Sequence, residues 1–116
     1  MIYKITSLKT SFLMILLFSS LLSSNEIIVI DVRSFEEVKT GIIQDAIHIE
    51  WTQIEKEISK IDVSKDQSIY LYCRSGNRSG KAAVMLEKIG FTNVINAGGI
   101  KEAAKKLDKK IVQYSE

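Results

Sequence analysis

Short apolar runs alternate with helix-like segments along most of this chain. β-Branched and aromatic residues are concentrated in EIIVIDV (26–32), AIHIEW (46–51), SIYLYC (68–73) and TNVINA (92–97). The first run is apolar almost throughout, which predicts a strand that is buried on both faces. Strands separated by helices usually form a parallel sheet with helices on both faces. The sequence therefore predicts one α/β domain with a central parallel sheet flanked by helices.

The segments between these runs have helix signals. Ser34 and Glu37 form a capping box that predicts a short helix at 34–38, and Thr52 and Glu55 predict a second one at 52–61. A third helix is expected over 79–90, closed by Gly90. The amphipathic segment 100–114 predicts the last helix.

The first 24 residues have the pattern of a secretory signal peptide. Lys4 and Lys9 come before an uncharged, apolar stretch that continues to Glu26. The apolar part is shorter than the roughly 20 residues that a membrane-spanning helix needs. We therefore expect residues 1–24 to direct export to the periplasm, with an uncleaved N-terminal anchor as the alternative. Residues 25–116 would form the single folded domain.

Charge gives little indication of a macromolecular partner. The chain has 16 Lys and Arg against 14 Asp and Glu, and two of the lysines lie in the N-terminal segment. The folded domain is thus close to neutral, so a cationic site must come from local arrangement. We expect a monomer that binds no nucleic acid and contacts a membrane only if its N-terminal segment is retained. Glu102 and Asp108 are interleaved with lysines 101, 105, 106, 109 and 110, which predicts a solvated helix face.

Cys73 is the only cysteine, and it stands in the segment YCRSGNRSG. It has no internal disulfide partner, and one cysteine with one histidine, His48, is too few for a structural zinc site. No metal or cofactor is expected. Cys73 must be inert and buried, paired with another molecule, or reactive.

The position of Cys73 favours a reactive thiol. Ligands of parallel sheets bind beyond the carboxyl ends of the strands, where Cys73 ends a predicted strand. Gly76 allows backbone N–H groups to converge on one point, and the helix that starts near Ser79 directs its positive end to that point. Arg78 and Arg74 add positive charge, although Arg74 could equally be a solvated side chain. These features should lower the pKa of the thiol.

Three segments resemble the rhodanese family in the expected order. CRSGNRS (73–79) resembles its active-site loop CxxGxRS, IDVRSFEEVKTGIIQDAIHI (30–49) its N-terminal signature, and NAGGIKEA (96–103) its C-terminal signature. The resemblance covers essentially all of residues 26–107 and is closest to small exported single-domain rhodaneses. It implies a three-layer fold and a thiosulfate sulfurtransferase.

By this resemblance, Cys73 is the nucleophile that carries sulfur as a persulfide. The substrate-binding residues would be those of the loop, whose N–H groups would surround the sulfur: Arg74, Ser75, Gly76, Asn77, Arg78 and Ser79. Arg78, with Arg74 as a second candidate, would bind the anionic donor. The partners would be a small anionic donor such as thiosulfate and a thiophilic acceptor such as cyanide.

The chain departs from the family pattern between its first signature residues and the cysteine loop. Ile42 replaces the usual histidine, and Gln44-Asp45 replaces Pro-Gly, which puts the shape of that loop in question. Asp31 and Arg33 match the family's DVR element, for which we expect an internal ion pair. We interpret His48 as a packing residue rather than a base.

Two other functions use the same thiol. The first is a non-enzymatic module that senses oxidants or binds a partner through Cys73. The second is a phosphatase or arsenate reductase, whose related loops have five residues between cysteine and arginine. Here four residues separate Cys73 from Arg78, which favours a smaller anion.

Overall fold

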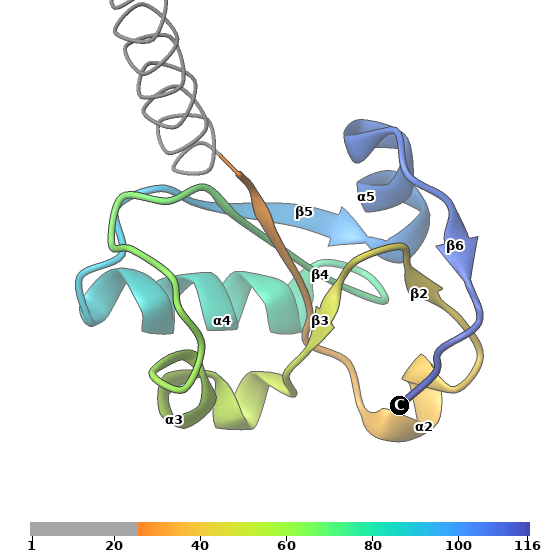
Figure 1. Ribbon diagram of the computed structural model, residues 1–116, viewed down its shortest axis with the longest axis horizontal. Coiled ribbons are helices and arrows are strands. Elements are labelled where there is room, and N and C mark those ends of the chain that lie inside the picture. The colour runs from red at the N-terminus through yellow and green to blue at the C-terminus, as the bar shows by residue number, and fades with distance from the viewer. Residues whose placement is uncertain (1–25) are drawn as a thin grey trace, which may run out of the picture.

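The computed structural model describes residues 26–116. A parallel sheet runs through the centre of the domain (Figure 1). Its strand order is β3-β1-β4-β5, made by Ile28–Asp31 (β1), Ile47–His48 (β3), Ile69–Cys73 (β4) and Val94–Gly99 (β5). This sheet confirms the predicted α/β fold.

Helices cover both faces of the sheet. The helices Ile54–Ile58 (α3) and Asn77–Lys88 (α4) lie on one face, and Ile100–Leu107 (α5) lies on the other (Figure 1). The short helix Phe35–Val38 (α2) follows β1. Ser34 caps α2 together with Glu37, as predicted: each residue's side chain accepts a hydrogen bond from the backbone N–H of the other.

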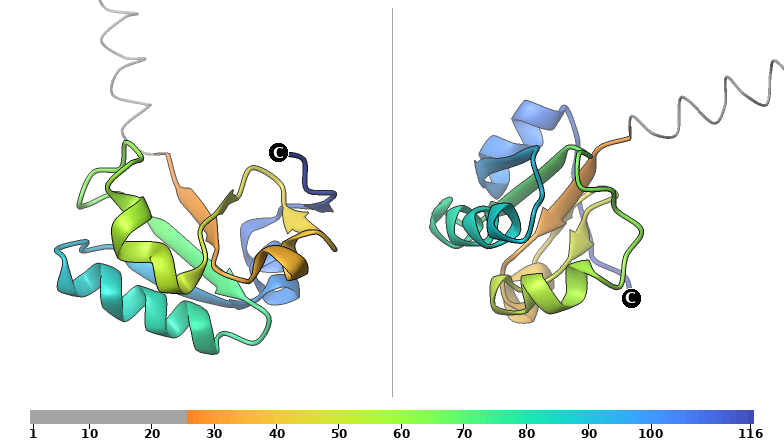
Figure 2. Two further views of the ribbon diagram at one scale, coloured as in Figure 1. Left: turned by 90° about the horizontal axis from the view of Figure 1, so that it is seen from below. Right: turned by 90° about the vertical axis from the view of Figure 1, so that its left-hand side faces the viewer.

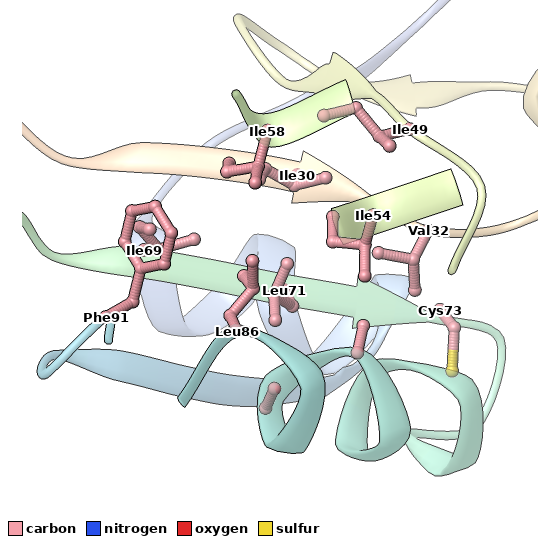
Figure 3. Packing of buried hydrophobic residues seen from close by; sticks show 12 residues of the cluster. Ile30, Val32, Ile49, Ile54, Ile58, Ile69, Leu71, Cys73, Leu86 and Phe91 are labelled. Carbon is pink, nitrogen blue, oxygen red and sulfur yellow. The ribbon is translucent and has the colours of Figure 1, made fainter. Parts of the chain in front are cut away.

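The core has one cluster of buried side chains on each face of the sheet. Successive residues of a strand point to opposite faces, so Ile30 belongs to the α3 and α4 side while Val29 belongs to the α5 side. The larger cluster includes Leu71, Leu86 and Cys73 (Figure 3). Full burial of such aliphatic side chains stabilises the fold by about 1.5–3 kcal/mol each.

A buried ion pair fixes the carboxyl end of β1. Asp31 is 0% exposed, and its carboxylate accepts hydrogen bonds from Arg33, including one of 2.7 Å from Nη2. The same Nη2 donates to the carbonyl of Gly41 at 2.6 Å. The predicted internal ion pair is therefore confirmed, and it connects β1 to the loop that precedes β2 (Ile42–Ile43).

The second predicted helix, 52–61, was wrong at both ends, because α3 covers only Ile54–Ile58. Thr52 is not an N-cap; it lies inside a 3-10 turn, Trp51–Gln53 (η1), that precedes α3. A contact with the residue that follows β1 fixes this turn, because the N–H of Trp51 donates to the carbonyl of Val32 at 3.1 Å. Helix α4 begins at Asn77, two residues before the expected start at Ser79. Its predicted end is confirmed by Gly90, which has a φ of +103°.

The last predicted helix was too long. Helix α5 ends at Leu107, because Asp108 adopts a left-handed conformation with φ of +52°. The chain then forms β6 (Ile111–Val112), which pairs antiparallel with β2 (Ile42–Ile43), as Figure 1 and Figure 2 show. Neither of these short strands was expected. Spacing alone fits a longer helix, and only the distant partner β2 makes the extended form favourable.

Two surface interpretations are confirmed. His48 packs in a cluster with the rings of Phe35 and Tyr114, and its Nε2 lies 2.7 Å from the carbonyl oxygen of Arg33. Most of the lysines on and after α5 are exposed, while Ala103 faces the core.

The predicted signal peptide, residues 1–24, lies outside the described residues. Between Glu26 and Glu116, no helix combines the length and the apolar character that crossing a membrane requires.

Candidate active site

Cys73 is the last residue of β4, and only 1% of it is exposed. Figure 3 shows its sulfur pointing from the strand end toward the first turn of α4. Residues 74–76 form the loop between β4 and α4. The nucleophile predicted from sequence thus stands at the carboxyl edge of a parallel sheet, where such folds bind ligands.

Gly76 gives the loop its shape. Its φ of +94° lies in the left-handed region that glycine tolerates best, and its N–H donates to Cys73 Sγ at 3.0 Å. A Cβ at this position would stand 3.3 Å from the Cα of Gly98. Both the conformation and the close packing therefore require glycine here.

Further donors surround the sulfur. Ser79 Oγ lies 3.4 Å from Sγ, and Ser79 itself is 0% exposed. Burial alone would raise the pKa of Cys73, but bonds from the Ser79 hydroxyl and from the N–H groups of Ser79, Ser75 and Gly76 outweigh it and lower that pKa to about 7. The sequence predicted this direction from converging N–H groups, the start of the helix and arginine charge, and in the structure the lowering comes from hydrogen bonds of the loop and of the first turn of α4. A substantial fraction of Cys73 is a thiolate at neutral pH.

Asn96 organises the loop from the neighbouring strand β5. Its Oδ1 accepts hydrogen bonds from Ser79 Oγ at 2.7 Å and from Gly98 N at 3.0 Å, and its Nδ2 donates to the carbonyl of Gly76 at 2.9 Å. Sequence reasoning missed this residue. Its one signal was its place in the NAGG segment, next to the glycines.

The glycines that follow Asn96 allow β5 to approach the loop backbone. A Cβ on Gly99 would lie 2.6 Å from the carbonyl oxygen of Arg74, a distance that real Cβ atoms do not reach. The double glycine therefore lets the end of β5 support the loop directly.

The two arginines of the loop have different surroundings. Arg78 forms a bidentate ion pair with Glu37 of α2, with Nη1–Oε1 at 2.6 Å and Nη2–Oε2 at 2.8 Å. Arg78, together with hydrogen bonds from Ser34, lowers the pKa of Glu37 to about 2 although partial burial opposes this shift. Sequence reasoning treated Glu37 only as a cap and missed this contact. The ion pair joins α2 to the start of α4, which lie near each other in Figure 2.

Arg74 is exposed, and its side chain makes no ion pair or hydrogen bond with any of the described residues. It lines a pocket of about 350 Å³ together with residues of the β1–α2 region: Arg33, Glu36, Glu37 and Thr40. Ser75 and Asn77 are also exposed. The structure thus brings Gly76 and Ser79 to the sulfur and leaves Arg74 beside a pocket.

The protein family that this sequence matches agrees with the site geometry described above. The sequence model of the rhodanese-like domain matches residues 17–106 of the chain. The chain belongs to the rhodanese family. This rhodanese is 36% identical over 75 residues to the thiosulfate sulfurtransferase PspE of Escherichia coli, an alignment that covers 65% of this chain and 72% of PspE. It is 37% identical over 78 residues to the putative sulfurtransferase YtwF of Bacillus subtilis, covering 67% and 74% of the two chains.

A solved structure agrees with these sequence matches. It is described as rhodanese with anions from E. coli, and it is similar to this chain with a TM-score of 0.70 and 31% sequence identity. The match covers 77% of this chain and 100% of the solved one. Family membership makes the chain a rhodanese-like sulfurtransferase.

The loop that departs from the family pattern keeps a compact turn in this rhodanese. Asp45 stands where the family has the glycine of Pro-Gly, and its φ is +68°. Aspartate is among the few other residues that visit this conformation. The N–H of Ala46 donates to the carbonyl of Ile43 at 3.0 Å and closes the turn.

Within residues 26–116, no group of three or more His, Cys, Asp and Glu side chains is arranged to hold a metal ion.

Proposed function

We propose that this protein is a thiosulfate sulfurtransferase that transfers sulfane sulfur through a persulfide on Cys73. The observation that carries the proposal is the cluster of N–H and O–H donors at Sγ, with a pKa of about 7 for the thiol. Thiosulfate as donor is supported by the relative PspE, which is a thiosulfate sulfurtransferase. The donors stabilise a sulfur anion in both the free and the loaded enzyme.

In the first half-reaction, the Cys73 thiolate attacks the outer sulfur of thiosulfate. A new bond forms between Sγ and that sulfur, the S–S bond of thiosulfate breaks, and sulfite leaves with the electron pair. In the second half-reaction, cyanide attacks the outer sulfur of the persulfide. Thiocyanate leaves and Cys73 returns as a thiolate, as expected for covalent catalysis in two steps.

The loop residues would have distinct roles in these steps. The N–H groups of Ser75, Gly76 and Ser79 already act on Sγ, and those of Arg74, Asn77 and Arg78 would complete the cradle for the outer sulfur. Glu37 holds Arg78 near the loop and compensates its charge, so Arg78 would bind the anionic donor by hydrogen bonding rather than by a free positive charge. Arg74 would attract the donor from the exposed side.

The test is to incubate the purified full chain with thiosulfate and record its intact mass. The expected result is a gain of one sulfur atom, which cyanide then removes as thiocyanate. Cys73→Ser serves as the control and should gain nothing. A wild-type chain that takes up no sulfur from thiosulfate would contradict the proposal.

In that case the same thiol would be assigned to a non-enzymatic role, in oxidant sensing or partner binding. Peroxide treatment followed by a sulfenic-acid probe would then distinguish an oxidant sensor, because a thiolate with a pKa of about 7 oxidises readily.

We further propose that the protein acts in the periplasm, delivered by residues 1–24. The support is the order of Lys4, Lys9 and the apolar stretch in the sequence. Fractionation of cells that produce the full chain should recover it in the periplasm. Recovery of all the protein in the cytosol would contradict export.

A further inference from the structure

The Ser79 hydroxyl lies within reach of two acceptors but has only one proton to donate. Its Oγ is 3.4 Å from Cys73 Sγ and 2.7 Å from Asn96 Oδ1. Ser79 is 0% exposed, so bulk water does not supply a third partner. When one acceptor receives the proton, the other loses a donor. The position of the proton therefore depends on which of the two is the stronger acceptor.

The other contacts of Asn96 determine which of its atoms lies toward Ser79. Its Nδ2 donates to the carbonyl of Gly76 at 2.9 Å, and its Oδ1 accepts the N–H of Gly98 at 3.0 Å. A flipped amide would place two acceptors together at Gly76 and two donors together at Gly98. Oδ1 is thus an acceptor that has no proton to give to Ser79. The amide of Asn96 competes with the sulfur for the hydroxyl proton.

The charge on Sγ changes during the proposed reaction. The thiolate attacks the outer sulfur of thiosulfate, a bond forms between Sγ and that sulfur, and sulfite leaves with the electron pair of the broken S–S bond. The negative charge of the thiolate is then on the outer sulfur of the persulfide, while Sγ is neutral and bonded to two atoms. A thiolate is a strong acceptor, whereas neutral divalent sulfur is a weak one. The better acceptor for the Ser79 proton is therefore Sγ before loading and Asn96 after it.

We propose that Asn96 is a positioning residue for sulfur transfer: it holds the Ser79 proton while Cys73 carries sulfur and releases it to Sγ when the thiolate returns. The proposal rests on the sulfurtransferase function proposed above. The oxygen of Ser79 stays where α4 holds it, and only its proton turns. Without Asn96, the buried hydroxyl of the loaded enzyme would have only a weak acceptor, which costs free energy. Asn96 therefore stabilises the persulfide relative to the free thiolate.

The first test measures how far Ser79→Ala raises the pKa of Cys73 when residue 96 is a weaker or a stronger acceptor. The pKa is obtained from the pH dependence of alkylation of the full chain by iodoacetamide. Asn96→Ala removes the competing acceptor, so the rise caused by Ser79→Ala should be about half a pKa unit larger than in the wild-type background. In Asn96→Asp a carboxylate keeps the proton, and the rise should be smaller. An equal rise in all three backgrounds would overturn the proposal.

This comparison separates the proton from a merely structural role of Asn96. Loss of the contact with Gly76 would loosen the loop, and an aspartate would act on the thiol through its charge. Both effects are present with and without the Ser79 hydroxyl, so they cancel in the difference. Arg78, a charged residue of α4 that interacts with Cys73, is the same in every variant.

Asn93→Ala serves as the matched control. Asn93 precedes β5, at the opposite end of the strand from the loop, and its Nδ2 donates to the hydroxyl oxygen of Ser68 at 2.7 Å. The substitution removes an exposed asparagine that bonds to a serine, as Asn96→Ala does, but it lies away from the sulfur. The rise caused by Ser79→Ala should be the same in Asn93→Ala as in the wild-type background.

The second test measures the loading equilibrium. The full chain is mixed with thiosulfate and sulfite at a fixed ratio and at a pH well above 7, where Cys73 is ionised, and intact mass gives the ratio of persulfide to free enzyme. Asn96→Ala should lower this ratio about threefold, whereas the same substitution added to Ser79→Ala should leave it unchanged. No change in the wild-type background, or an equal change in both backgrounds, would contradict the role of Asn96.

The two tests distinguish this proposal from the proposed function. A wild-type chain that takes up no sulfur from thiosulfate would defeat the sulfurtransferase function. The alkylation measurement needs no sulfur transfer, so an equal rise in its three backgrounds would defeat the role of Asn96 even if Cys73 loads normally.

Discussion

Cys73 combines two properties that usually oppose each other. It packs in the larger core cluster with 1% exposure, yet its thiol has a pKa of about 7. Burial favours the neutral thiol, and the donors from Gly76 and Ser79 favour the thiolate. The donors prevail because they are fixed by the loop and by the first turn of α4, so they need no rearrangement when the charge forms.

The rate at which Cys73 takes sulfur from thiosulfate should follow this ionisation. The thiolate is the nucleophile, so the rate should rise as the pH increases through about 7 and then level off. The same curve should be obtained for alkylation of Cys73 by iodoacetamide. A rate that keeps rising until pH 9 would show that the donors do not act on the thiol.

Replacing the Ser79 hydroxyl should shift that curve. In Ser79→Ala the sulfur loses its side-chain donor, so the pKa of Cys73 should rise above about 7. The one proton of the Ser79 hydroxyl is shared between Sγ at 3.4 Å and Asn96 Oδ1 at 2.7 Å, so the bond to sulfur is weaker than a full charged hydrogen bond and a rise of up to about one pKa unit is expected. Titration of the thiolate absorbance measures it. Ser75→Ala, at an exposed side chain, serves as the control and should leave the curve in place.

Some residues of the site could be predicted from the sequence and others could not. Cys73 and Gly76 were predicted because they lie together in one segment at a strand end. Asn96 was not predicted, since its contacts with Gly76 and Ser79 join residues distant in the sequence. Glu37 was assigned to the capping box, and its second contact depends on how α2 packs against α4. Local patterns contain no information on such packing.

At the scale of elements, Glu37 connects α2 to α4. Its carboxylate accepts hydrogen bonds from the N–H of Ser34 and from both terminal nitrogens of Arg78. Helix α2 has only four residues and needs tertiary contacts to be stable, because isolated helices of that length are unstable. The ion pair therefore stabilises α2 and the position of Arg78 at the same time.

Glu37→Gln should destabilise the fold in a pH-dependent way. The pKa of Glu37 falls from 4.5 to about 2 on folding, so its stabilising charge is fully present above pH 4.5 and is lost as the pH falls toward 2. At pH 7 we expect a loss of about 1 kcal/mol, since both side chains are partly exposed. Urea unfolding from pH 7 to pH 2 should show the difference between the two proteins shrinking below pH 4.5. A difference that is constant over this range would contradict the ion pair.

A methyl group at Gly99 should disturb the loop from β5. In Gly99→Ala the Cβ would meet the Arg74 carbonyl oxygen at 2.6 Å, and both atoms belong to or adjoin the backbone. Relief of this contact must move β5 or the loop, at a cost of about 1–3 kcal/mol. Thermal unfolding should show the loss of stability, and the pKa of Cys73 should rise as its N–H donors shift. Unchanged values for both would show that the approach of β5 is not needed.

The sequence predicted which strands and helices exist better than it predicted where they begin and end, because the boundaries depend on tertiary contacts. The four strands of the main sheet were all predicted, because continuous apolar runs are a strong signal. The predictions for the first turn of the segment after β3 and for the end of α5 were wrong. In both places the backbone bonds to a segment distant in the sequence: Trp51 bonds to the carbonyl of Val32, just after β1, and β6, which follows α5, pairs with β2.

At the scale of the whole molecule, the C-terminal segment closes the domain. β6 pairs with β2, Lys109 forms an ion pair with Asp45 at 3.5 Å, and Tyr114 packs against Phe35 and His48. These contacts cover the loop in which Ile42 and Asp45 replace the usual family residues.

Removal of residues 109–116 should lower the stability of the domain. Ile111 and Val112 are 44% and 37% exposed, so each buries about half of its side chain, and together they contribute about 2 kcal/mol. Chemical unfolding of the truncated and the full chain measures the difference. The double variant Lys105→Gln, Lys106→Gln changes exposed residues of the same helical region and should have little effect. Equal stability of the truncated and full chains would show that β6 contributes nothing.

The loop at Cys73 takes its support from three separate parts of the fold: Asn96 and the glycines of β5, Glu37 of α2, and the first turn of α4. A loop with so many anchors has no inexpensive way to open by itself. Its amide hydrogens should therefore exchange with solvent only when the sheet itself unfolds. The reactivity of Cys73 should then be lost in the same cooperative transition in which the domain melts.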